Sequence, residues 1–176
     1  LDVRKHGLDF DIVWFKMPPP AFLGGQSPLR AYVGRGHLLI AYLAADGLLQ
    51  VAWIITKGTY GELRRRGISE WVEEMAHHVT PDLGVHLRTH SRSLTDSFLL
   101  STVSDRVTSW SVPGVLVIGD AAHTMSPVGA QGINIALRDA LVAANHLIPA
   151  LTDGGAASAA LDAAGAQAAP DVHATL

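Results

Sequence analysis

The chain has 176 residues, of which 48% are apolar and 16% charged, and this suits one ordinary domain or two partial ones with a sizeable core. Its net charge of -3 offers no basic surface for nucleic acid, and its lack of Cys excludes disulfides and thiolate metal sites. No apolar run approaches the roughly 18 residues of a membrane span, and the first residues lack a signal-peptide pattern, so we expect a cytoplasmic protein without nucleic-acid or membrane partners.

The first third of the chain carries apolar runs that Gly and Pro interrupt. Residues 1–9 are polar and predict a connector, and the next apolar run predicts a strand that Pro18–Pro20 ends. A β-hairpin is the clearest pattern, between Tyr32 and Thr56, and Asp46-Gly47 predicts a type I′ turn. Two interpretations stay open for this sheet: it roofs a pocket for a planar organic substrate, or it is purely structural.

The middle of the chain is more polar. Residues 57–67 predict a solvated connection with three consecutive Arg. Ser69 predicts the N-cap of a helix that Pro81 ends. His86 and His90 would share one face of a helix, but no Cys and no H-E-x-x-H arrangement accompanies them, so we expect no metal site.

The pattern around which the chain is organised runs from Val115 to Ala144. A strand is predicted at residues 98–103, and residues 107–112 lead from it to this pattern through Pro113-Gly114. Four apolar residues, Val115–Ile118, predict a strand buried on both faces. Gly119-Asp120 then places a carboxylate just past the strand's carboxyl end, where ligands bind in open α/β sheets. A helix is predicted from Ile133, and we expect the following residues to form its buried face: Ile133, Ala136, Leu137, Ala140, Leu141 and Ala144.

The loop before this helix has the residues of a ligand site. Gly129 and Gly132 allow backbone to come close to a ligand, because no Cβ blocks the approach. The first helical turn has N–H groups without internal partners and the positive end of the helix dipole. Asp120 can accept hydrogen bonds from ligand hydroxyls, and Gln131 and Asn134 add amide groups.

The tail after Leu151 is rich in Ala and Gly. Residues 156–169 predict one helix, which Gly165 weakens and Pro170 stops. Because its apolar side chains are mostly methyl-sized, we expect a marginal or frayed tail.

Residues 119–140 read G-D-A-A-H-T-M-S-P-V-G-A-Q-G-I-N-I-A-L-R-D-A. This stretch resembles the second flavin-binding motif of class A FAD-dependent monooxygenases, the para-hydroxybenzoate hydroxylase-like group. The resemblance implies that Asp120 binds the ribityl chain of FAD, that Pro127 lies beside the isoalloxazine ring, and that residues 129–134 face its pyrimidine edge. It gives these cofactor-binding candidates: Gly119, Asp120, Pro127, Gly129, Ala130, Gln131, Gly132, Ile133 and Asn134. Pro127 and Gly129 are also the candidates for the catalytic environment of the flavin, whereas for His123 we expect a structural hydrogen bond.

The first fingerprint of such enzymes, G-x-G-x-x-G, does not occur. Gly34-Arg35-Gly36 lacks the third Gly, and Asp46-Gly47 has the context of a hairpin rather than of the family's Asp-Gly motif. We therefore expect the C-terminal portion of such an enzyme, an α/β fold in which an antiparallel substrate-binding sheet precedes the returning strand–loop–helix part of a Rossmann-like FAD domain. The expected domains are a substrate-binding layer (1–111), the C-terminal part of the FAD domain (112–151) and the tail (152–176).

The resemblance implies an FAD-dependent monooxygenase that uses NAD(P)H and O₂ and hydroxylates an aromatic or polyketide-like substrate through a flavin C4a-hydroperoxide. The implied partners are this substrate and the missing N-terminal half of the FAD domain, with a homo-oligomer also possible. Two alternatives remain open: a non-catalytic binding remnant of a flavoprotein, and a halogenase or reductase of the same superfamily.

Overall fold

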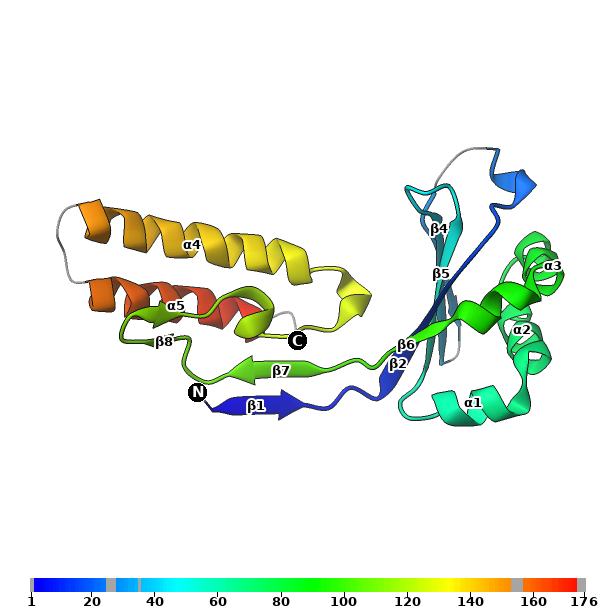
Figure 1. Cartoon of the computed structure of the whole chain (residues 1–176), viewed down its shortest axis with the longest axis horizontal. Coiled ribbons are helices and arrows are strands. Elements are labelled where there is room, and N and C mark those ends of the chain that lie inside the picture. Colours follow the sequence, from blue (N-terminus) through cyan, green and yellow to red (C-terminus); the bar gives the residue numbers. More distant parts are fainter. Residues whose placement is uncertain (1, 25–27, 35, 153–156, 174–176) are drawn as a thin grey trace. The chain divides into compact units, whose positions relative to one another are not determined.

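A computed structural model describes residues 2–24, 28–34, 36–152 and 157–173. The chain forms two compact units (Figure 1). Residues 9–101 are the sheet unit, and residues 1–8 together with 102–176 are the helix-pair unit. These boundaries differ from the expected ones after residues 111 and 151, because the first residues pair with a strand that follows the sheet unit.

The sheet unit is built on a five-stranded antiparallel sheet in the order β3-β4-β5-β2-β6. Its strands are β2 (Phe10–Met17), β3 (Arg30–Gly34), β4 (His37–Leu43), β5 (Leu49–Thr56) and β6 (Phe98–Leu100). Each predicted apolar run in this region forms a strand. Consecutive side chains of a strand point to opposite faces, so a run that is apolar throughout supplies apolar side chains to both faces of the sheet. The predicted strand at residues 98–103 is shorter than expected.

One face of this sheet packs against helices α1 (Tyr60–Arg66), α2 (Ile68–Ala76) and α3 (Pro81–Thr89). Val13, Val51 and Trp53 from the strands meet Trp71 and Leu87 from the helices, and all five are 2% exposed or less. Figure 1 shows the three helices gathered on one side of β5 and β2. This layer is the hydrophobic core of the unit.

The β4–β5 turn differs from the predicted type I′ turn. Gly47 has φ +78, but among the described residues the only non-Gly residue with positive φ is Ala130, so Asp46 is not left-handed. The Gly47 N–H donates to the Ala44 carbonyl (2.9 Å), and the Leu48 N–H donates to Asp46 Oδ1 (3.1 Å). The hairpin therefore closes with a three-residue loop that ends in a left-handed Gly.

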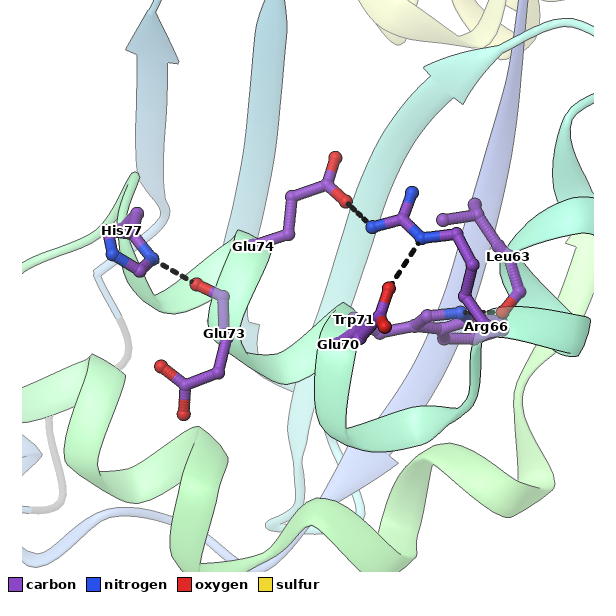
Figure 2. A network of polar contacts seen from close by, with 7 residues as sticks. All are labelled: Leu63, Arg66, Glu70, Trp71, Glu73, Glu74 and His77. Carbon is purple, nitrogen blue, oxygen red and sulfur yellow. Dashed lines mark hydrogen bonds and ion pairs between the residues drawn. The ribbon is translucent and has the colours of Figure 1, made fainter.

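The predicted polar connection at residues 57–67 was wrong, because residues 60–66 form α1. Its Leu63 is buried, and Arg66 pairs with Glu70 (2.8 Å) and Glu74 (3.1 Å) of α2 (Figure 2). Contacts between helices therefore stabilise a segment whose sequence has little apolar periodicity. Helix α2 begins at Ile68, with Gly67 rather than Ser69 as its N-cap, and Pro81 begins α3.

The helix-pair unit begins with β1 (Val3–His6), which pairs antiparallel with β7 (Ser104–Val107). The first residues are thus a strand rather than a connector. Within the connecting residues 107–112, β8 (Ser111–Val112) forms and pairs with β9 (Val115–Leu116). The prediction of a strand at 115–118 buried on both faces was wrong, since β9 is shorter and Val115 is 51% exposed.

Two long helices complete this unit, α4 (Gly132–Thr152) and α5 (Ala157–His173), which lie side by side in Figure 1. The expected frayed tail is instead a packed helix, because small side chains let α5 approach its neighbours closely. Leu161, Ala164 and Ala168 are buried, and α5 continues through Pro170 to His173.

Residues 25–27 and Arg35, the latter in the Gly34-Arg35-Gly36 sequence, lie outside the described residues. Within the described part of the chain, no helix combines the length and apolar content that a membrane crossing requires. His86 on α3 and His90, which caps the C-terminus of α3, have ring centroids 4.4 Å apart, and His86 Nε2 contacts the Pro18 carbonyl at 2.8 Å. The described residues contain no group of three or more His, Asp or Glu that could hold a metal ion.

Candidate cofactor site

The first element of the candidate site is a tight turn, Gly119–Ala121, directly after β9 and residues 117–118. Gly119 is buried with φ +56, a conformation that glycine adopts readily. A Cβ at this position would lie 3.2 Å from the Cβ of Ala136 on α4, so the turn sits directly against the helix. Asp120, the middle residue of the turn, is exposed, and its carboxylate is accessible to a ligand.

The second element is the loop that leads into α4. Pro127–Gly129 forms a single 3-10 turn, and Ala130 follows with φ 51. The Gln131 side chain donates to the Gly129 carbonyl (3.2 Å) and accepts from Asn134 (3.3 Å). These short-range contacts order the loop. The first N–H groups of α4, like those of any helix, have no acceptor within the helix.

The glycines of this segment differ in what they require. A Cβ on Gly132 would have no heavy atom within 4 Å, and one on Gly129 would meet only Gln131 Cγ at 3.7 Å. Neither Gly129 nor Gly132 has a positive φ, whereas Gly119 does. Nothing in the described chain therefore requires glycine at positions 129 and 132. Their missing side chains leave open space beside the backbone, and a ligand that approaches the backbone closely needs such space.

A buried pair, His123 and Asp139, lies beneath the turn. His123 Nε2 is 2.6 Å from Asp139 Oδ2, and both side chains are 1% exposed or less. The Gly119 N–H donates to the same oxygen (3.0 Å), and the His123 ring stacks on Trp110 at 5.1 Å between centroids. The sequence indicated a structural role for His123, but its partner Asp139 was not among the predicted site residues, since only the fold brings the two together.

The helix face that we expected to be buried is exposed. Ile133, Leu137, Leu141 and Ile148 are 60–77% exposed and align along α4, and we call them the apolar stripe. The face that packs within the unit instead carries Asp139, Val142 and Ala143. The spacing correctly indicated an apolar face, but no described part of this unit covers it.

The sheet unit has a second, apolar face opposite its helices. Paired residues share a face, and the register joins Ile12 with Ile54, Trp14 with Ala52, and Ile40 with Ala52. Trp14, Ile40 and Ile54 are half-buried there. A cavity of about 210 Å³ lies on the other side, lined by residues of β5 and α1. Arg66 and Glu74 on that cavity pair with each other, so we assign no cofactor or substrate to it.

Comparison with known proteins identifies the family of the chain. The model of the family described as FAD binding domain matches residues 3–176. The chain belongs to this FAD-binding domain family. The membership confirms the resemblance to FAD-dependent aromatic hydroxylases that residues 119–140 indicated.

Two curated relatives of this family member are monooxygenases. The 6-methylpretetramide 4-monooxygenase of Streptomyces rimosus is 31% identical over 170 residues, which are 97% of this chain and 40% of that protein. Protoasukamycin 4-monooxygenase of Streptomyces nodosus subsp. asukaensis is 30% identical over 108 residues, which are 61% of this chain and 26% of that protein. The chain thus spans less than half the length of either relative.

Solved structures show the same fold. PqsL, a probable FAD-dependent monooxygenase from Pseudomonas aeruginosa, superposes with a TM-score of 0.77 at 20% identity, over 99% of this chain and 48% of that one. Another PqsL structure, with similar coverage, is a complex with 2-aminobenzoylacetate. The likeness confirms the predicted mixed α/β class, with an antiparallel sheet followed by strand, loop and helix.

Proposed function

We propose that this chain is part of an FAD-dependent monooxygenase that uses NAD(P)H and O₂ to hydroxylate an aromatic or polyketide-like substrate. The observation that carries the proposal is the exposed Asp120 in a turn packed on α4, followed by a loop whose Gly129 and Gly132 face open space. The family match and the two monooxygenase relatives support the same activity. A cytoplasmic location is a further part of this proposal.

The residues present fit FAD. Asp120 would accept hydrogen bonds from the ribityl hydroxyls, and the N–H groups of residues 132–134 would stabilise negative charge at the pyrimidine edge. Pro127 and Gly129 would shape the space beside the ring, with Ala130 and Gln131 completing the loop. When bound, the flavin supplies the activation of O₂, and these residues orient it and exclude water.

The second face of the sheet is the proposed substrate layer. Its apolar side chains, among them Trp14, Ile40 and Ile54, suit a planar organic molecule. The PqsL complex holds an aromatic ligand, and the name of the Streptomyces rimosus relative specifies a pretetramide. Both names support an aromatic or polyketide-like substrate here.

We also propose that further polypeptide completes the cofactor site. The apolar stripe of α4 is the support, since exposed apolar surface of this extent marks an interaction site. The expected N-terminal part of an FAD domain would supply the pyrophosphate site that residues 119–134 lack. A second copy of the chain is the alternative occupant of the stripe.

The test is Asp120→Ala in the full-length gene product, with Asp162→Ala as a control carboxylate elsewhere in the helix-pair unit. We expect FAD affinity to fall by about 1–3 kcal/mol, because the ribityl hydroxyls lose an acceptor. Flavin fluorescence titration measures it. Unchanged affinity would contradict the role of Asp120.

The same preparation separates the alternatives. Substrate hydroxylation coupled to NAD(P)H oxidation would support the monooxygenase. Bound FAD without hydroxylation would favour a halogenase or reductase, and a colourless protein that binds no flavin would favour the non-catalytic remnant.

A further inference from the structure

The segment Gly119–His123 contains the turn that carries Asp120, and both of its end residues contact a single oxygen atom. Asp139 Oδ2 on α4 accepts the Gly119 N–H at 3.0 Å and lies 2.6 Å from His123 Nε2. The turn is also closed on itself, because the His123 N–H donates to the Gly119 carbonyl (2.9 Å). Asp120 lies between these two anchored residues.

The same histidine joins the turn to β7. The backbone of His123 forms an isolated bridge with Arg106, and the Val107 N–H donates to the Ala122 carbonyl (2.9 Å). The ring is held flat against Trp110, with an angle of 28° between the rings. Three elements, β7, the turn and α4, therefore meet at His123.

Fold stability alone is a weak explanation for this arrangement. Burying a carboxylate and an imidazole costs desolvation, and apolar replacements of such pairs are often neutral or stabilising. Hydrogen bonds from two directions, in contrast, fix geometry closely. Residues held in this way are well suited to set the direction of an exposed neighbour.

We propose that His123 and Asp139 are positioning residues. They hold the segment Gly119–His123 in a fixed position against the first turns of α4. The Asp120 carboxylate and the N–H groups of residues 132–134 then present one surface to the flavin. The inference rests on the proposed function. Its core, the coupling of the turn to α4 through Asp139, can be measured without any flavin.

The experiment compares Asp139→Ala and Asp139→Asn with Val142→Ala, a core truncation on the same buried side of α4 (7% exposed). Amide hydrogen exchange of Gly119 and His123 is read by NMR in the 176-residue chain. We expect exchange at Gly119 to quicken about tenfold or more in Asp139→Ala, because local opening frees its N–H. Asp139→Asn should restore protection, since its amide oxygen accepts both hydrogen bonds. Val142→Ala should lower the melting temperature and leave Gly119 protected relative to its neighbours.

Flavin affinity of the full-length gene product is the second readout. We expect Asp139→Ala to weaken FAD binding about tenfold, and Val142→Ala to leave the affinity of folded protein unchanged. If wild-type protein binds no FAD while Asp139→Ala still frees Gly119, the proposed function fails and the coupling stands. Equal protection of Gly119 in Asp139→Ala and wild type would overturn the inference, as would FAD binding that Asp139→Ala leaves unaltered. Should Asp139→Ala not fold, His123→Phe tests the other contact of Asp139, because it keeps a ring on Trp110 and removes the Nε2 contact. Faster exchange of the residue-123 amide is then the expected result, and unchanged exchange would overturn the inference.

Discussion

At the scale of single residues, Gly119 and Gly132 are glycines for different reasons. Gly119 needs its left-handed φ of +56 and its closeness to Ala136. We expect Gly119→Ala to lower the free energy of unfolding by about 1–3 kcal/mol, the usual cost of such strain. Denaturant titration of the 176-residue chain measures it.

Gly132→Val is the matched change, at a position where a Cβ meets no neighbour. We expect it to cost no more than a few tenths of a kcal/mol in the flavin-free chain, since Val is acceptable in a helix. In the full-length gene product it should weaken FAD binding, because the side chain would occupy the space left for the flavin edge. A large loss of stability in the flavin-free chain would show that Gly132 is a packing residue instead.

His78 gives a pH-dependent prediction. Its ring stacks on His37 at 3.7 Å between centroids, and partial burial, followed by His37, lowers the pKa of His78 below its ordinary 6.5. The unfolded chain therefore binds this proton at a higher pH than the folded chain, so stability is present above pH 6.5 and falls as the pH drops through that value. The melting temperature should fall between about pH 7.5 and about pH 5.5, and fall less in His78→Gln. An identical loss in the variant would contradict the assignment.

The candidate residues of the site could be named from the sequence because they lie close together in it, from Gly119 to Asn134. What the sequence could not show is Asp139 as their anchor, or that Ala130 rather than a glycine has the left-handed φ in the loop. The first depends on how α4 packs against the turn. The second accompanies the closure of the 3-10 turn Pro127–Gly129, in which the Ala130 N–H donates to the Pro127 carbonyl. Side-chain partners on different elements are set by the fold, and no local pattern encodes them.

At the scale of elements, the strands β2, β4 and β5 were predicted because each is a long β-branched or apolar run with a clear stop. Helix α1 was missed, because Leu63 is its one buried residue and a single apolar position gives no helical pattern to recognise. Helix α5 was underestimated for a related reason. Its Ala and Gly residues have little area to bury, but they permit close approach.

Gly165 tests the close approach of α5. A Cβ on Gly165 would lie 3.3 Å from the Trp110 Cβ, whereas Ala166, next to it on the helix, is exposed. We expect Gly165→Val to lower the free energy of unfolding by about 1–3 kcal/mol through overpacking. Ala166→Val should cost less than about 1 kcal/mol, which is its helix-propensity penalty. Similar losses from both changes would mean that α5 is only loosely packed.

At the scale of the whole molecule, the apolar stripe makes the isolated chain prone to association. Leu137 and Leu141 are 66% and 62% exposed, so replacing both by Lys removes apolar surface without opening the core. We expect the 176-residue chain to elute as dimers or larger species, and the Leu137→Lys, Leu141→Lys double variant to elute as a monomer with little change in melting temperature. A wild-type chain that stays monomeric at high concentration would contradict this use of the stripe.

The pairing of β1 with β7 sets a waiting time during synthesis. Val3 is synthesised before the sheet unit and finds its partner only when Val107 has been made, and at about 5–20 residues per second the interval between the two is several seconds. The sheet unit, which is contiguous in sequence, can finish folding inside this interval. Conditions that speed translation shorten the period in which β1 is a lone strand, and rare codons between these two strands lengthen it. The yield of correctly folded protein should therefore respond to codon choice within the sheet unit, even where the amino-acid sequence is untouched.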